Sequence, residues 1–267
     1  MKILFFGDVV GRVGRKGLVS ALPKLKEQYK PDLVLANVEN IAHGTGLTER
    51  TVAEIFRAGV AGCTTGNHAW RKESAELIGK NIGLPIATPA NDLRTVKDKR
   101  WQVVKNGEKT LVLINLLGQT FINDPDLLSP FTTFDEIYNE LVAKKLNDYV
   151  LVDFHAEATS EKIAFGWYVD GRATVVVGTH THVQTNDNRI LSNGTAYITD
   201  IGMCGPADTV LGVDKEVIIK KFLANNSINF VIPDDGPADV SAVYVEIDDL
   251  TKKALKIEKI YLTGTIK

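Results

Sequence analysis

The chain has 267 residues, of which 44% are hydrophobic and 24% are charged, and 31 Lys and Arg against 33 Asp and Glu give a formal net charge of −2. This length fits one large α/β domain or two small ones, and the composition supports a full hydrophobic core. A nearly neutral chain gives no argument for a polyanion-binding surface, so we expect no stable binding to nucleic acid.

The N-terminus and the two cysteines indicate a cytoplasmic protein. The first apolar run is short and ends at Asp8, whereas a signal peptide needs about 7–15 apolar residues at this position. No run of about 18 apolar residues occurs, so we expect no membrane-spanning helix. Cys63 and Cys204 are too few for a disulfide framework and form no C-x-x-C pair, which is typical of a reducing compartment.

Short runs rich in Val, Ile and Leu alternate with longer amphipathic segments along most of the chain. The runs predict strands buried on both faces, over Lys2–Gly7, Leu33–Val38, Val60–Thr64, Thr110–Leu116, Tyr149–Phe154, Ala173–Val177 and Ala196–Thr199. Apolar residues at helical spacing predict helices over Arg15–Tyr29, Thr48–Ala58, Phe134–Leu146 and Asp214–Leu223. Thr48 is the predicted N-cap of the second helix. The alternation predicts a largely parallel sheet with helices on its faces.

The last third of the chain has a different pattern. Ala238–Ile247 alternates apolar and polar residues, and Lys256–Leu262 follows a charged turn at Asp248–Lys253. Two strands of period two in succession predict an antiparallel hairpin added to the sheet system. Residues 81–109 are rich in Pro, Asn, Lys and Gly, and we expect a surface excursion there. Because no repeat, low-complexity tract or linker divides the chain, we expect a single domain over residues 1–267.

Polar side chains stand at the C-terminal ends of five of the predicted strands. In chain order they are Asp8, Glu39, Asn40, Asn67, His68, His155, His180 and His182. Because open α/β sheets bind ligands beyond the carboxyl ends of their strands, we expect these side chains to share one rim. Imidazole and carboxylate groups suit Zn, Mn and Fe. The pattern therefore predicts a metal site.

The spacing of these residues leaves the number of metals open. In an extended segment, His180 and His182 would point the same way about 6.6 Å apart, at ~3.3 Å per residue. One metal could take both, or two metals could take one each with a carboxylate between them. Adjacent Asn67 and His68 point in different directions, so Asn67 could face a metal while His68 faces the substrate. Two divalent ions among only two carboxylates would leave positive charge, which favours a phosphoryl substrate.

Several weaker candidates accompany the strand-end residues. His43 lies in a Gly-rich loop and could contact a phosphate or base, or could simply be exposed. Glu157 and Thr159 could orient His155, although Thr159 could instead cap the helix that starts there. Trp70 could stack on a base or only pack.

Short sequence blocks along the chain resemble one superfamily. The calcineurin-like metallophosphoesterases have similar blocks in the same order as Gly7-Asp8-Val-Val-Gly11, Asn37-Val-Glu39-Asn40, Gly66-Asn67-His68 and Gly178-Thr-His180-Thr-His182. More narrowly, the bacterial 2′,3′-cyclic-nucleotide 2′-phosphodiesterase branch is similar over Phe154–Lys162, Val177–Gln184 and Thr199–Met203. The resemblance covers essentially the whole chain. It implies a layered α/β sandwich of mixed β-sheets flanked by α-helices, with an antiparallel C-terminal hairpin.

The resemblance also implies a set of metal ligands. Val10 occupies the histidine position of the general D-x-H motif, and Glu39 followed by Asn40 stands where a bridging Asp is usual. The narrower branch shares both changes, and in it Asn40 would supply the missing ligand. One metal would be held by Asp8, Glu39, Asn40 and His182. The other would be held by Glu39, Asn67, His155 and His180. The branch is associated with iron, and Mn or Zn could substitute.

The activity implied by the resemblance is hydrolysis of 2′,3′-cyclic nucleotides to 3′-nucleotides. A metal-bridging hydroxide would attack phosphorus, and His68 would protonate the leaving ribose 2′-oxygen as general acid. A homo-oligomer is also implied. Two alternatives stay open. The same chemistry could act on a nucleotide monoester or a phosphoprotein, or the chain could be a metal-bound regulatory or RNA-related protein with little turnover.

Overall fold

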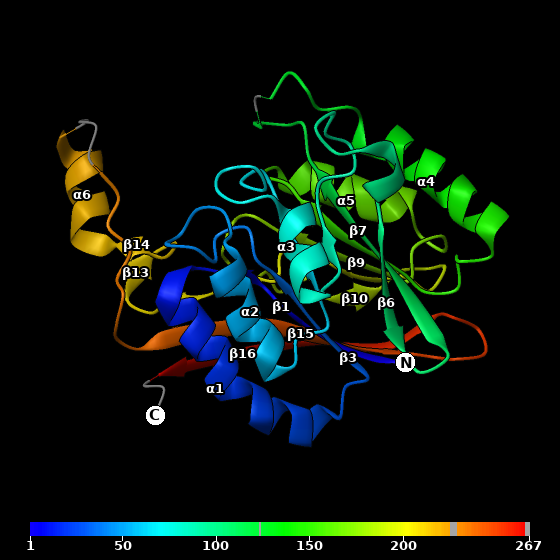
Figure 1. Ribbon diagram of the computed structural model, residues 1–267, viewed down its shortest axis with the longest axis horizontal. Coiled ribbons are helices and arrows are strands. Elements are labelled where there is room, and N and C mark those ends of the chain that lie inside the picture. Colours follow the sequence, from blue (N-terminus) through cyan, green and yellow to red (C-terminus); the bar gives the residue numbers. More distant parts are fainter. Residues whose placement is uncertain (123, 225–228, 265–267) are drawn as a thin grey trace.

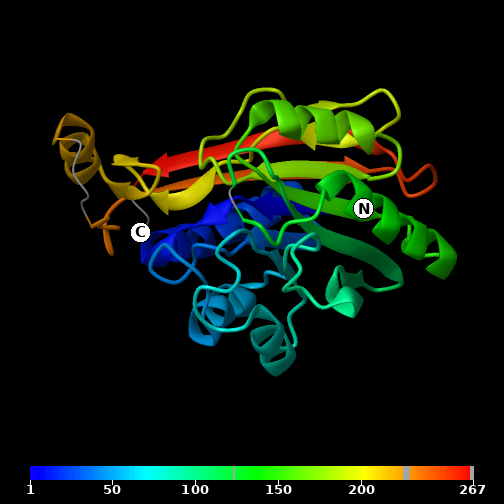
Figure 2. The same ribbon diagram turned by 90° about the horizontal axis from the view of Figure 1, so that it is seen from above.

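The computed structural model describes residues 1–122, 124–224 and 229–264, and it forms a sandwich of two β-sheets between two layers of helices (Figures 1 and 2). The facing sides of the two sheets share one buried apolar cluster, which includes Phe5 and Leu35 from one sheet and Leu113 and Val177 from the other. The layered sandwich that the family resemblance implies is therefore confirmed. Within the described residues, no helix is long and apolar enough to cross a membrane.

The first sheet contains the N-terminal strand and the C-terminal hairpin. Its strands follow the order β2, β12, β15, β1, β3, β4, β5, with β16 paired to β15. Their bounds are β1 (Lys2–Phe6), β2 (Asp8–Val9), β3 (Leu33–Asn37), β4 (Gly62–Thr64), β5 (Ile86–Ala87), β12 (Met203–Pro206), β15 (Ala238–Ile247) and β16 (Ala254–Gly264). β1, β3, β4 and β5 are parallel, whereas β15 and β16 form the predicted antiparallel hairpin.

The second sheet comes from the middle of the chain. Its strands follow the order β10, β11, β9, β8, β7, β6. Their bounds are β6 (Gln102–Asn106), β7 (Lys109–Leu117), β8 (Val150–His155), β9 (Val175–Thr179), β10 (Arg189–Ile190) and β11 (Ala196–Ile198). The four central strands are parallel, so their carboxyl ends lie at one edge. A separate ribbon pairs β13 (Thr209–Val210) with β14 (Val213–Asp214).

The helices lie on the outer faces of the two sheets. The first sheet is covered by α1 (Gly11–Tyr29), α2 (Glu49–Ala58) and α3 (Ala75–Ile82), and the second by α4 (Pro130–Lys144) and α5 (Thr159–Tyr168). A short 3-10 helix, η1 (Lys97–Lys99), precedes β6, and α6 (Lys215–Ala224) stands apart beside β13 and β14 (Figure 1). As predicted, Thr48 caps α2, and the helix ends at Gly59, which has a φ of 106°.

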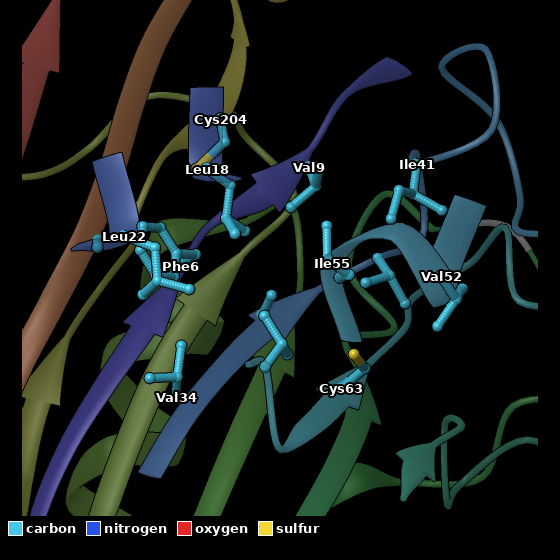
Figure 3. Close-up of a cluster of buried hydrophobic side chains, with 14 of the residues drawn as sticks. Phe6, Val9, Leu18, Leu22, Val34, Ile41, Val52, Ile55, Cys63 and Cys204 are labelled. Carbon is cyan, nitrogen blue, oxygen red and sulfur yellow. The ribbon is translucent and has the colours of Figure 1, made fainter. Parts of the chain in front are cut away.

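An apolar core under α1 and α2 holds the first sheet in place. Figure 3 shows Leu18 and Leu22 of α1 beside Phe6 of β1, and Val52 and Ile55 of α2 near Cys63 of β4. Cys63 and Cys204 are both free and buried in this cluster. Their burial raises the pKa of both thiols, so they serve as small apolar residues.

Two sequence expectations differ from the structure. The alternation of strands and helices predicted one largely parallel sheet, but the chain crosses to a second sheet after β5. Residues 81–109 are not only a surface excursion, because they contribute the edge strands β5 and β6. The Pro, Asn and Gly residues around these short strands are typical of loops, so the sequence does not indicate strands there. A single domain over residues 1–267 stays a prediction.

Candidate active site

The predicted site residues lie where the carboxyl edges of the two sheets meet. Asp8 follows β1, the Glu39–Asn40 pair follows β3, and the Asn67–His68 pair follows β4, all in the first sheet. His155 ends β8, and the segment 180–182 follows β9, both in the second sheet. The structure thus brings all seven predicted metal ligands and the predicted general acid to one rim, although two sheets supply them.

One group of donors surrounds the buried imidazole of His155. Its Nε2 lies 3.1 Å from Glu39 Oε2, 2.9 Å from Asn67 Oδ1 and 3.0 Å from His180 Nδ1. One ligand atom each from Glu39, His155 and His180 lies within 4.8 Å of the other two. These four residues are those that the resemblance assigned to one metal.

A second group adjoins the first through Glu39. Asn40 Nδ2 lies 2.9 Å from Glu39 Oε1 and 3.2 Å from His182 Nε2, and His182 Nε2 lies 3.9 Å from Asp8 Oδ1. Asp8, Glu39 and Asn40 are buried. The four residues match the set that the resemblance assigned to the other metal, with Glu39 common to both groups.

Two further observations fit the binding of cations in these groups. Asp8 Oδ1 is buried without a hydrogen-bond partner among the described residues, and an unpaired buried carboxylate oxygen is costly unless it binds an ion or water. Gly66 keeps the space open, because a Cβ there would lie 2.1 Å from Glu39 Oε2 and 2.6 Å from His155 Nε2. Carboxylate, amide and imidazole donors together suit transition metals.

The buried carboxylates and histidines of the site shift one another's pKa values. Burial raises the pKa of Asp8 to about 6, and it would raise the pKa of Glu39, but neighbouring histidines hold that carboxyl well below its usual value. Burial opposes charge on His155, yet Glu39 and other carboxylates raise its pKa to about 9. Burial and the charge of His155 lower the pKa of His180 to about 3. A bound cation would replace the proton of His155, so metal binding would release protons.

His68 lies beside the donor groups and faces outward. Its side chain is 27% exposed, whereas that of Glu39 is 2% exposed. His68 Nδ1 lies 2.8 Å from Asn40 Oδ1 and 3.4 Å from Glu39 Oε1. These acceptors favour a proton on Nδ1 and leave Nε2 as the ring nitrogen that can reach a substrate.

The loop that carries the last two histidines is not extended. His180 and His182 have φ values of 100° and 63°, so the prediction that they point the same way from an extended segment is wrong. A buried ion pair between Lys162 and Asp200, 2.7 Å apart, supports the turn. Lys162 Nζ donates to the Thr179 carbonyl oxygen at 2.7 Å, and Asp200 Oδ2 accepts from the Thr181 N–H at 3.1 Å.

Other side chains orient the histidines in a way that sequence reasoning assigned only in part. Glu157 contacts His180 Nε2 at 2.9 Å rather than His155, whose Nδ1 lies 2.8 Å from Thr179 Oγ1. Thr159 is not the cap of α5, because Ala158 is the N-cap residue. Thr159 also does not orient His155, whose ring nitrogens lie beside Thr179 and Asn67. The sequence analysis did not predict the Lys162–Asp200 ion pair, although both residues lie within the sequence blocks that resemble the phosphodiesterase branch.

Two weaker candidates lie outside the donor groups. His43 is exposed in its loop and has a φ of 57°, and it lines a groove with Arg12 and Arg15. Trp70 packs against the Arg94 guanidinium, whose Cζ lies 4.3 Å from the ring centroid. A role of His43 in substrate binding stays a prediction.

Comparison with known proteins identifies relatives along nearly the whole chain. The chain is 50% identical to a 2′,3′-cyclic-nucleotide 2′-phosphodiesterase of Bacillus subtilis, over 98% of this chain and 97% of that protein. A crystal structure of a hypothetical protein from Thermus thermophilus aligns at 34% identity with a TM-score of 0.89, covering 99% of this chain and 100% of that chain. A phosphatase from Mycoplasma pneumoniae aligns at 35% identity with a TM-score of 0.88, covering 98% and 93%.

These relatives confirm the resemblance to the metallophosphoesterases that the sequence blocks carry. The family described as YmdB-like protein matches residues 4–260. The chain therefore belongs to the YmdB-like protein family.

Proposed function

We propose that the protein is a dinuclear metal-dependent phosphodiesterase that hydrolyses 2′,3′-cyclic nucleotides to 3′-nucleotides. The observation that carries this proposal is the pair of donor groups that share Glu39, with His68 at their open side. The name of the Bacillus subtilis relative, at 50% identity, supports the choice of substrate.

The two donor groups would each hold one metal ion. Asp8, Asn40 and His182 would bind one ion, and the donors around His155 would bind the other, with Glu39 between them. Metal ions in such a site supply Lewis acidity that neutralises phosphoryl oxygens and activates water. We propose iron as the native metal because the branch that the sequence resembles is associated with iron, and the histidine and carboxylate donors would also accept Mn or Zn.

His68 would act on the leaving group. Its Nδ1 lies 3.4 Å from Glu39 Oε1, and the exposed edge of the ring could pass a proton to the ribose 2′-oxygen as the P–O bond breaks. Because Glu39 also contacts His155, the general acid and the metal donors are positioned by the same carboxylate.

The experiment that tests this function compares three substrates with the metal-loaded protein. We expect 2′,3′-cAMP to be hydrolysed to 3′-AMP much faster than 3′,5′-cAMP or p-nitrophenyl phosphate, and we expect a chelator to stop the reaction. Preference for p-nitrophenyl phosphate would favour a monoesterase instead. Retention of two metals per chain without turnover of any phosphoester would favour a regulatory role.

A further inference from the structure

A cavity of about 470 Å³ borders the candidate metal centre on the side of His182. Strands β15 and β16 contribute its floor, and the loop after β9 and the β13–β14 turn contribute its walls. The lining includes His182, Gln184, Met203, Leu211, Asp239 and Tyr261. Pockets for small ligands have volumes of about 300–1,000 Å³, so the space is large enough for a nucleobase.

His182 joins this cavity to the metal centre. Its Nε2 lies 3.2 Å from Asn40 Nδ2 within the centre, and its Nδ1 lies 3.0 Å from the carbonyl oxygen of Leu211 at the cavity wall. One imidazole ring therefore separates the two spaces. A nucleotide whose phosphate lies at the centre could extend its base past this ring into the cavity.

Asp239 brings a carboxylate to the wall of the cavity beside Tyr261, and its Oδ1 is buried with no hydrogen-bond partner among the described residues. A buried, unpaired carboxylate oxygen is costly, and a turn of the side chain would let it meet a donor in the cavity. Burial, and then the neighbouring carboxylate of Asp239, raises the pKa of the Tyr261 hydroxyl. Tyr261 is 57% exposed beside the carboxylate and offers an aromatic surface for stacking.

The wall of the cavity is held firmly against its floor. Gln184 Nε2 lies 3.3, 3.1 and 3.3 Å from the carbonyl oxygens of Ile201, Ala242 and Ile260, which share its two hydrogens. Gly202, with a φ of 76°, permits this approach, because a Cβ there would lie 2.9 Å from the backbone nitrogen of Gln184. A wall fixed in this way keeps the cavity formed before a ligand arrives, which reduces the entropic cost of binding.

We propose that this cavity is a nucleobase pocket in which the Asp239 carboxylate accepts a hydrogen bond from the edge of the base while Tyr261 packs against the ring. The inference rests on the proposed phosphodiesterase function and adds base selectivity to it. A carboxylate favours guanine, whose N1–H and N2–H₂ are neighbouring donors. It disfavours uracil, whose single N3–H lies between two carbonyl acceptors.

Steady-state kinetics with substrates that carry a nucleobase or lack one test the proposed pocket. The substrates are 2′,3′-cGMP, 2′,3′-cUMP and the base-free methyl riboside 2′,3′-cyclic phosphate. The variants are Asp239→Leu, Asp239→Asn, which retains one acceptor oxygen, and Asp98→Leu, an exposed aspartate outside the cavity, as the matched control. Calorimetric titration with guanosine 3′-monophosphate measures base binding without turnover.

We expect Asp239→Leu to raise KM for 2′,3′-cGMP by about tenfold or more, with a smaller effect on kcat. The loss should be smaller for 2′,3′-cUMP and smallest for the base-free substrate, and Asp239→Asn should lose less than Asp239→Leu. The Kd of guanosine 3′-monophosphate should rise by a similar factor, and the control variant should behave like the unchanged protein.

Equal losses for 2′,3′-cGMP and the base-free substrate would overturn the proposal, because Asp239 would then act on the metal centre or the fold. Unchanged binding of guanosine 3′-monophosphate in Asp239→Leu would also overturn it. If the unchanged protein hydrolyses none of the cyclic phosphates, the proposed function fails, and the calorimetric titration still decides whether the cavity binds the base.

Discussion

Removal of Lys162 should destabilise the protein and loosen the loop that carries His180 and His182. Lys162 and Asp200 have side chains that are each 1% exposed and form an ion pair at 2.7 Å. The variant Lys162→Met leaves the Asp200 carboxylate buried without its cation. Breaking one partner of a buried pair costs about 3–5 kcal/mol. At about 2–4 °C per kcal/mol for a chain of this size, the melting temperature should fall by about 6–20 °C.

Equilibrium unfolding in urea, followed by circular dichroism with chelator present throughout, measures this cost without a contribution from bound metal. The double variant Lys162→Met/Asp200→Asn removes both charges and should recover much of the lost stability. A loss below about 1 kcal/mol for Lys162→Met would show that the buried ion pair does not stabilise the protein. A double variant whose loss of stability equals the sum of the losses of the two single variants would show that the two charges are not coupled.

Three other substitutions test the site itself. Gly66→Ala places a Cβ 2.1 Å from Glu39 Oε2, so elemental analysis of the purified variant should find less than the full metal content; unchanged stoichiometry would contradict the packing argument. His68→Ala should lower kcat by about 10²–10⁴-fold while both metals stay bound, and loss of a metal would identify His68 as a ligand instead. Glu157→Gln weakens the contact to His180 Nε2 and should reduce metal affinity by about 10–100-fold in a competition with a chromogenic chelator; an unaltered affinity would show that this exposed carboxylate does not orient the ring.

The fold was predictable where the sequence pattern is long. β3 and β8 appear as largely apolar runs because both of their faces are buried. The β15–β16 hairpin appears as two alternating runs that flank a charged turn. The two-residue strands β5 and β10 are too short to have any periodicity, and the crossing to a second sheet depends on packing between residues distant in sequence.

The candidate site was predictable for residues that end a strand or come soon after one, such as His155 and Asn67, because the ends of parallel strands converge. Lys162 was missed because a lysine in a helical segment usually points to solvent, and only the packing of α5 buries it beside Asp200. The spacing argument for His180 was wrong because its positive φ turns the chain at a point where a non-glycine residue ordinarily stays extended.

We propose that this protein, with metal ions held by donor groups that share Glu39, hydrolyses the 2′-bond of a 2′,3′-cyclic nucleotide. Phosphorus NMR of 2′,3′-cAMP incubated with the metal-loaded protein tests this activity, because the spectrum distinguishes the two possible monophosphates. We expect 3′-AMP as the sole product and no reaction after chelation. Formation of 2′-AMP, or hydrolysis that continues in the presence of the chelator, would contradict the proposal.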